Sequence, residues 1–450
     1  MRKLVYIGMM VGTALLGACS DSYNPTPSAS GVFPAQGFSG RKLRVEISGE
    51  ETKWADGATV SFGDGITVSN VVVASESDIF ADLDIAATAT LSDHDVTVTS
   101  GKETDTLKTA FRVAPPVDFQ MGKAAQGSIT QLTITNHDFD NPFDTTSTGD
   151  GLFTPITYTN IQLDGGPGVT LQVNAVTPYS ITAVALIDVD APASIAAPQV
   201  VSGPAGGTQV TSNGAPIMIE ARTATVLADG TAATGMATTA YDSGLYTFTP
   251  GGYPGLMTIA LASNGTSGGT QFAMLPASGH FSDLLAANKV DLGWVLKSGS
   301  VYLVTYDFSG DSAYSYQLTA KSTTLTSTAA DTEPANSNSA TATTVTAPVL
   351  VDNATLTDGS DQDWFKVVVP AGKKIHVVTA PGDPGCDTLV DIYGPNNPAT
   401  LVTESSDADY HEDVTTDALT AGTYYVEISA SQAGFFVGSQ NHYVAGILLE

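Results

Sequence analysis

Residues 265–269 (GTSGG) have the spacing G-x-S-x-G, which can place a serine hydroxyl on a sharp turn as a nucleophile. That turn needs a strand before the serine, a helix after it, and an aspartate and then a histidine later in the chain. Residues 265–269 instead lie in a run of Gly, Ser and Thr between two predicted strands. We therefore interpret them as a loop and predict no serine hydrolase.

Metal-ligand patterns are incomplete as well. His411 and Glu412 begin the zinc pattern H-E-x-x-H, but Thr415 stands where the second histidine belongs. Residues 137–151 resemble a calcium loop, but Pro142 breaks the EF-hand spacing. We interpret this segment and a second acidic cluster as solvated loops; the aspartates and glutamate concerned are Asp138, Asp140, Asp144, Asp150, Asp407, Asp409, Glu412 and Asp413. Overall, the sequence predicts that the protein is not an enzyme.

The chain has two cysteines, and Cys19 stands in the stretch LGACS after an apolar run from Leu4 to Leu15. The run follows Arg2 and Lys3 and is shorter than the about 20 residues that span a bilayer, as in a secretory signal. LGAC resembles the lipobox of bacterial lipoproteins. The resemblance implies that residues 1–18 are a removed signal peptide and that Cys19 carries lipid chains. The alternative is an ordinary secreted protein with a stray cysteine.

The charge balance excludes one class of partner. The formal net charge is −29, with 17 Lys and Arg against 46 Asp and Glu. Nucleic acid phosphates are bound by clustered basic residues, so we expect no nucleic acid partner. Once Cys19 is lipidated, Cys386 remains alone, so the sequence predicts no intramolecular disulfide framework.

The composition predicts an all-β protein. Gly (44 residues) and Pro (23 residues) interrupt many short runs rich in Val, Thr and Ser, and no long amphipathic helix is evident. At about 100–150 residues per domain, the chain of 450 residues, less its signal segment, gives three or four domains. We expect tandem β-sandwiches, two immunoglobulin-like and two jelly-roll-like, after a signal peptide (1–18) and a lipidated tether (19–34).

The first predicted domain spans residues 35–116. Leu43, Val45 and Ile47 alternate with polar residues, as in a half-buried strand, and similar short runs follow at 59–62, 66–73, 95–99 and 111–113. The order of the stretches VSFGDGITVSNVVV, DVTVTSG and FRV resembles the IPT/TIG group of immunoglobulin-like domains. That resemblance implies a fold and brings no catalytic residue.

An internal repeat predicts a second copy at residues 117–220. The stretch from Gly63 (GDGITVSNVVVASESDIF) is similar to that from Gly165 (GGPGVTLQVNAVTPYSIT): each runs from a glycine turn through an extended strand to a serine closely followed by an isoleucine, Ile79 or Ile181.

Residues 326–450 resemble the bacterial pre-peptidase C-terminal (PPC) domain, a β-sandwich found in many exported proteins. The resemblance rests on the stretches DQDWFKVVVPAGKKIHVVTA, DTLVDIYGP and AGTYYVEISA. We expect Trp364, Val367 and Val369 to share the core face of one strand. A looser copy at residues 221–325 pairs Tyr302 with Tyr425.

Some PPC relatives in clostridial collagenases bind calcium. The resemblance implies matching ligands in an acidic joint and a nearby turn, namely Asp331, Glu333, Asn336 and Asp361 or Asp363. Calcium takes six to eight oxygen ligands. The alternative is a solvated linker followed by a turn that aspartate side chains cap.

Two hypotheses for function follow. The first is a protein of the bacterial envelope, lipid-anchored in what we expect to be the outer membrane, with a non-catalytic structural, adhesive or ligand-binding role toward a polysaccharide, matrix or envelope protein. The second is a calcium-dependent accessory module for an exported hydrolase or secretion system. We interpret the tyrosines that could stack on sugars as packing residues; they are Tyr241, Tyr253, Tyr410 and Tyr443.

Overall fold

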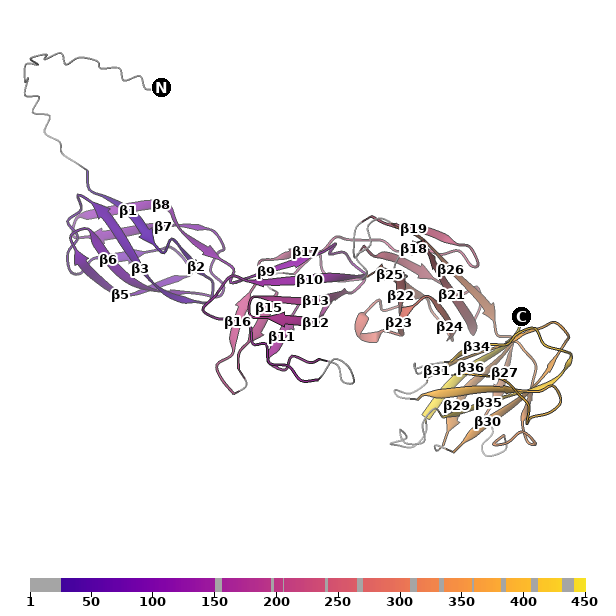
Figure 1. Cartoon of the computed structure of the whole chain (residues 1–450). Coiled ribbons are helices and arrows are strands. Elements are labelled where there is room, and N and C mark those ends of the chain that lie inside the picture. Colours follow the sequence, from indigo (N-terminus) through magenta and orange to yellow (C-terminus); the bar gives the residue numbers. More distant parts are fainter. Residues whose placement is uncertain are drawn as a thin grey trace, which may run out of the picture. The chain divides into compact units, whose positions relative to one another are not determined.

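In the part of the chain that this computed structural model describes, the regular elements are strands and one short 3-10 turn (Figure 1). The structure describes residues 26–149, 156–195, 198–204, 206–238, 242–264, 270–307, 314–331, 336–357, 360–381, 386–405, 412–430 and 441–450. Its contacts divide the chain into two units, residues 1–115 and 116–450. The predicted fold class, all-β with tandem sandwiches, is correct. None of the helical segments in the described ranges is long and apolar enough to cross a membrane.

The first unit is an immunoglobulin-like sandwich of two four-stranded sheets, ordered β1-β3-β6-β5 and β2-β8-β7-β4. Alternating side chains such as Val45 and Ile47 point between the sheets, where they meet Val96, Val98 and Phe111. The strands are β1 (Ser28–Phe33), β2 (Gln36–Phe38), β3 (Lys42–Glu50), β4 (Thr59–Ser61), β5 (Ile66–Ser75), β6 (Asp78–Ile85), β7 (Asp93–Ser100) and β8 (Glu103–Ala114).

One prediction for this region is wrong. Residues 28–33 were expected within an irregular tether, whereas they form β1 and pair antiparallel with β3, with Val32 opposite Ile47. The small residues 28–31 (SASG) carry little strand propensity, so pairing with the edge strand β3 determines their extended structure.

The second unit begins with another immunoglobulin-like sandwich, whose main sheet is ordered β12-β13-β10-β9. The core lies between this sheet and the shorter strands, and includes Ile134, Ile181 and Val200. The strands are β9 (Val117–Met121), β10 (Ser128–Asn136), β11 (Ile161–Asp164), β12 (Val169–Thr177), β13 (Ser180–Ile187), β14 (Ser194–Ile195), β15 (Gln199–Ser202), β16 (Val210–Asn213) and β17 (Ile217–Met218).

The internal repeat is a repeated hairpin. β5–β6 and β12–β13 are both antiparallel pairs with a bulge in the first strand, and Ile79 and Ile181 are both fully buried. The turn glycines Gly65 and Gly168 both have φ above +70°, and a Cβ on either would lie 3.0 Å from the Cα of Ala89 or Ala191. The same close approach therefore explains both glycines.

The third sandwich has sheets ordered β18-β20-β25-β22-β23 and β19-β26-β21-β24. Its elements are β18 (Thr225–Val226), β19 (Ala233–Ala237), β20 (Gly244–Phe248), β21 (Gly255–Ser263), β22 (Thr270–Leu275), η1 (Phe281–Asp283), β23 (Ala286–Lys289), β24 (Asp291–Leu296), β25 (Val301–Asp307) and β26 (Tyr314–Thr324).

The fourth sandwich has the same pattern with one added edge strand, in sheets ordered β28-β30-β35-β32-β33 and β27-β29-β36-β31-β34. Its strands are β27 (Ser327–Ala330), β28 (Thr343–Val345), β29 (Val349–Leu356), β30 (Gln362–Val369), β31 (Ile375–Pro381), β32 (Thr388–Tyr393), β33 (Leu401–Glu404), β34 (Asp413–Thr415), β35 (Gly422–Ala430) and β36 (Asn441–Leu449).

Strand register supports the predicted similarity of these two sandwiches. Tyr302 pairs with Thr247 on β20, and Tyr425 pairs with Lys366 at the matching place on β30. The predicted core face of β30 needs one correction: Phe365, rather than Trp364, joins Val367 and Val369 in the core. Side chains alternate with a period of two, so Trp364 lies on the other face, where it stacks on Tyr393 at 5.3 Å.

Sheets of neighbouring sandwiches in the second unit also pack on each other through their outer faces. Ile129, Val184 and Leu186 of the second sandwich contact an apolar patch of the third, made by Leu245, Ala273, Leu275, Phe281, Val304 and Tyr306. Leu256, Val295 and Leu325 of the third contact a patch of the fourth, made by Leu350, Val378, Val444 and Leu448. Strands such as β25 are therefore buried on both faces.

Candidate metal sites

The structure places an acid–amide pair in the interior of the fourth sandwich. Asp363 and Asn336 are both fully buried, and the Asn336 side-chain amide donates a 3.0 Å hydrogen bond to Oδ1 of Asp363. The Tyr443 hydroxyl donates to Oδ2 of Asp363 at 2.8 Å. Asp363 lies two residues before Phe365 on β30, so both side chains are on the same face of the strand. The strand itself therefore directs the Asp363 carboxylate into the core.

Asp331 approaches the same place from the joint between sandwiches. Burial raises the pKa of Tyr443 well above its usual value, and the charges of Asp363 and Asp331 raise it further. Oδ2 of Asp331 accepts hydrogen bonds from the backbone N–H and the hydroxyl of Thr355, at 3.0 and 3.1 Å.

Two oxygens of this group are buried without a hydrogen-bond partner among the described residues: Oδ1 of Asp331 and Oδ1 of Asn336. Buried polar atoms normally have a partner, and calcium takes carboxylate and amide oxygens. These two oxygens are of the type that calcium prefers, while both oxygens of Asp363 already accept hydrogen bonds, from Asn336 and Tyr443. Glu333, the remaining predicted ligand from the joint, lies outside the described residues.

Asp361 has a different role from Asp363. Its Oδ2 accepts from the backbone N–H and hydroxyl of Thr357, at 2.6 and 2.8 Å, and its Oδ1 accepts from the N–H of Gln362. Asp361 therefore caps the turn before β30, as the alternative interpretation expected for one of the two aspartates.

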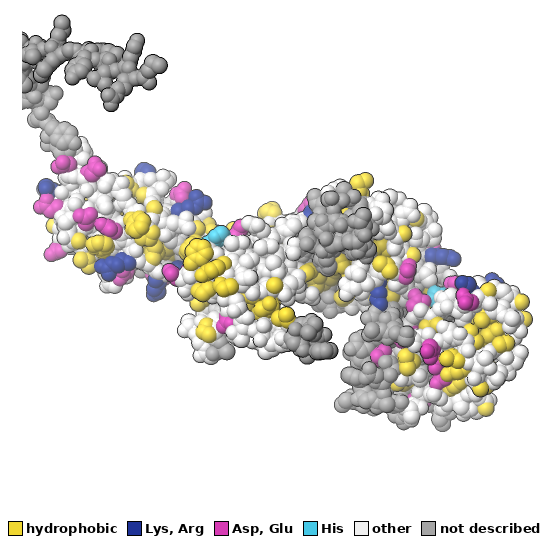
Figure 2. Space-filling view, viewed as in Figure 1, with side chains coloured by type: hydrophobic (Ala, Val, Ile, Leu, Met, Phe, Trp, Pro, Cys, Tyr) yellow, Lys and Arg dark blue, Asp and Glu magenta, His cyan; other side chains and the backbone are white. Residues whose placement is uncertain are grey.

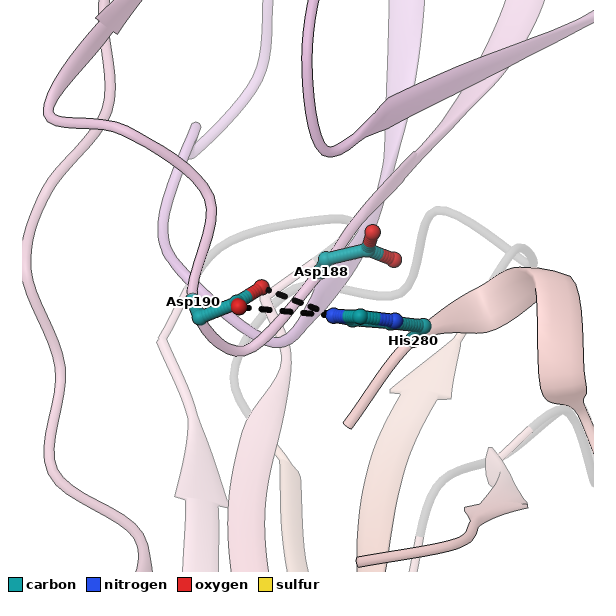
Figure 3. Close-up of side chains that lie close together, drawn as sticks. All are labelled: Asp188, Asp190 and His280. Carbon is teal, nitrogen blue, oxygen red and sulfur yellow. Dashed lines mark hydrogen bonds and ion pairs between the residues drawn. The ribbon is translucent and has the colours of Figure 1, made fainter. Parts of the chain in front are cut away.

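A second cluster, which the sequence did not reveal, joins the second sandwich to the third. Asp188 and Asp190 follow β13, and His280 precedes η1; one ligand atom from each lies within 4.8 Å of the others (Figure 3). Figure 3 shows the imidazole of His280 facing the Asp190 carboxylate, with the Asp188 carboxylate beside them. The distance from Nε2 of His280 to Oδ1 of Asp190 is 3.3 Å. The alternation Asp-Val-Asp was the one available signal, and nothing in the sequence links it to a histidine 90 residues later.

The remaining candidate residues are dispersed. Cys19, residues 265–269, His411, Asp150, Asp407, Asp409, Tyr241 and Tyr410 lie outside the described residues. Glu412, expected on a solvated loop, is instead 1% exposed, and its backbone is hydrogen-bonded to Thr379 of β31; Asp413 accepts a hydrogen bond from His376. In the 137–151 insertion, Asp138 and Asp144 accept hydrogen bonds from Asn141 and Asn160. Tyr443 is buried, as expected, and Tyr253 is 39% exposed.

Basic side chains form no continuous stripe on the face that Figure 2 shows; Lys and Arg are scattered there among Asp and Glu. In the first unit several pair with acids across the surface, as Lys42 does with Asp84 at 2.7 Å and Lys108 with Asp95 at 2.7 Å.

Two family models match parts of the chain. Residues 361–430 match the bacterial pre-peptidase C-terminal domain, which confirms that expectation. Residues 27–110 match the quinohemoprotein amine dehydrogenase alpha subunit domain III. The immunoglobulin-like fold is thus supported, while the IPT/TIG resemblance stays a prediction. Modules of both kinds lack a catalytic site of their own, so they fit a structural or binding protein.

A search of curated proteins finds no match. Similar solved structures include the plexin A4 extracellular region, at 13% identity and a TM-score of 0.19 over 42% of this chain and 18% of that one. The Bacteroides ovatus glucan-utilization protein SGBP-B, solved with a mixed-linkage heptasaccharide, has 11% identity and a TM-score of 0.15 over 64% and 72%. The titin I9–I11 tandem has 8% identity and a TM-score of 0.17 over 64% and 93%. Because these TM-scores are low, our fold assignment rests on the sheets described above.

Proposed function

We propose that this chain is a lipid-anchored protein of the bacterial cell envelope, in the outer membrane, with a non-catalytic structural, adhesive or ligand-binding role. The observation that carries the proposal is the series of β-sandwiches, three of which pack on one another through buried apolar faces. Domains that pack on one another in this way form a stiff scaffold for exposed loops, whereas domains without such interfaces would move independently.

The lipobox-like stretch before Cys19 supplies the anchor in this proposal. Several acyl chains on one residue hold a protein on a bilayer, whereas one chain binds only marginally. A polysaccharide, a matrix component or another envelope protein would then bind to the sandwiches beyond the membrane surface.

The anchor is tested by replacing its thiol. We expect the wild-type protein to incorporate labelled palmitate and to enter the detergent phase of Triton X-114, and Cys19→Ser to do neither. Cys386→Ala is the matched control, because that thiol is fully buried in the core of the fourth sandwich. An intact leader or an unmodified Cys19 thiol in mass spectra of the native protein would contradict the proposed location.

The role is tested on intact cells that carry the wild-type protein or Cys19→Ser. We expect envelope polysaccharide or an envelope protein to be captured with the wild-type chain only. Turnover of peptide or glycan substrates by the purified chain would instead argue for an enzyme.

A second candidate function is an accessory module in which calcium orders the joint before the fourth sandwich. The specific observation is the pair of buried oxygens without partners, Oδ1 of Asp331 and Oδ1 of Asn336. A bound ion at this place would fasten the joint to the body of the sandwich.

Calcium titration of the full chain tests this candidate. A ligand at about 100 times its Kd stabilises the folded state by about 2.7 kcal/mol, so we expect the fourth sandwich to melt roughly 5–10 °C higher in scanning calorimetry. Asp331→Asn should remove this shift, and Asp417→Asn, an exposed aspartate of the same sandwich, should preserve it. An unchanged melting temperature with saturating calcium would rule the site out.

A further inference from the structure

The Asp188, Asp190 and His280 cluster lies where two sandwiches meet. Asp188 and Asp190 belong to the loop after β13 in the second sandwich, and His280 to the loop after β22 in the third. The backbones of the two loops are joined directly, because the N–H of Val189 donates to the carbonyl of Gly279 at 3.1 Å. The N–H of Phe281 also donates to Oδ1 of Asp188 at 2.8 Å. The loops are therefore held together before any ligand arrives.

The side-chain distances suit a small metal ion. Zinc binds imidazole nitrogen and carboxylate oxygen at about 2.0–2.1 Å, so two such ligands at the tetrahedral angle lie roughly 3.3 Å apart. Nε2 of His280 lies 3.3 Å from Oδ1 of Asp190. All three ligand atoms lie within 4.8 Å of one another, so small side-chain rotations bring Asp188 into the same coordination sphere.

The other nitrogen of His280 lies on the side of a third carboxylate. Nδ1 lies 3.9 Å from Oδ2 of Asp283, and Asp283 is itself held by the hydroxyl of Ser278 at 3.0 Å. This carboxylate adds negative charge beside the ring, at a distance too long for a hydrogen bond to Nδ1.

The charge around the cluster is unbalanced. Three carboxylates, those of Asp188, Asp190 and Asp283, surround one imidazole, and among the described residues no Lys or Arg forms an ion pair with any of them. Even a protonated His280 leaves negative charge in excess, which a divalent cation would neutralise. The Asp190 side chain is 69% exposed and that of His280 is 40% exposed, so an ion can enter and water can complete its coordination.

We propose that Asp188, Asp190 and His280 bind a divalent transition metal ion of the zinc class, which fastens the second sandwich to the third. Mixed imidazole and carboxylate ligands favour such ions, whereas calcium and magnesium prefer oxygen alone. This site goes beyond the proposed envelope function and does not depend on it.

Metal binding to the full chain, stripped with EDTA beforehand, tests the proposal. We expect isothermal titration with zinc to give one site, and cobalt to give visible d–d absorption bands from a site of low coordination number. His280→Ala and Asp190→Asn should each weaken binding by about 100-fold or more, because each removes a direct ligand. The matched control is His137→Ala, an exposed histidine of the second sandwich, which should bind like the wild type.

Circular dichroism establishes that each variant is folded, and Asp190→Asn, at an exposed position, is the variant least disturbing to the fold. No zinc binding by the wild type would overturn the proposal, and so would equal affinity in His280→Ala and His137→Ala. Loss of stability in His280→Ala without any metal binding by the wild type would show a simple ion pair and would overturn it too. Asp331→Asn should keep the zinc site, so the calcium candidate can fail independently.

Discussion

His376 is a buried imidazole held between two carboxylates in the fourth sandwich. Its side chain is 5% exposed, Nε2 lies 2.7 Å from Oδ1 of Asp413, and Nδ1 lies 3.1 Å from Oε1 of Glu450. Burial lowers the pKa of His376, but the hydrogen bonds and charges of Asp413 and Glu450 outweigh it, so the pKa lies above its ordinary value. A protonated ring has two N–H donors, one for each carboxylate.

This arrangement predicts a pH-dependent stability. Because the folded pKa is raised, the stabilisation is fully present below the ordinary pKa of 6.5 and is lost as the pH rises through the folded value. Each unit of the raised pKa is worth about 1.4 kcal/mol of unfolding free energy. Melting temperatures measured from pH 6 to 9 should therefore decline more steeply in the wild type than in His376→Gln. Equal slopes in the two proteins, with His137→Gln as control, would refute this assignment.

Single residues differed in how far the sequence could predict them. Asp331, Asn336 and Asp363 were predicted from a family resemblance; the structure pairs Asn336 with Asp363, and their role as calcium ligands stays a prediction. His280 had no such guide: it lies 90 residues from Asp190, and only the packing of two sandwiches brings them together. A contact of that kind leaves no local pattern in the chain.

At the scale of elements, periodicity predicted strands whose two faces differ. Val45 and Ile47 alternate with Arg44 and Glu46, and β3 lies there with its apolar side inward. Periodicity does not distinguish the two faces of a strand that is buried on both, such as β25, because Val304 and Tyr306 contact the neighbouring sandwich while Val301 and Leu303 fill the core. It failed at β30, where apolar Trp364 and Phe365 stand side by side.

At the scale of the whole molecule, Gly446 shows how closely the third and fourth sandwiches approach. Gly446 lies on β36, paired with Leu350 and Val378, and a Cβ there would lie 2.7 Å from Cδ1 of Leu256 in the third sandwich. The absence of a side chain at this position allows two sheets to pack on each other.

We therefore expect Gly446→Val to force this interface apart. Overpacking costs about 1–3 kcal/mol, so the fourth sandwich should melt earlier and as a separate transition in scanning calorimetry. Gly251→Ala is the control, because a Cβ there would meet only Oδ2 of Asp229 at 3.8 Å. A single transition at the wild-type temperature would show that the interface tolerates the valine side chain.

The apolar outer faces also constrain how such a chain can evolve. A sandwich acquired by recombination in place of the third one would have to match two neighbours at once, at Ile129 and Leu186 on one side and at Leu350 and Leu448 on the other. Excised alone, it would expose both patches to solvent and tend to self-associate. The three sandwiches of residues 116–450 should therefore be inherited together, and substitutions should covary across the two interfaces between them.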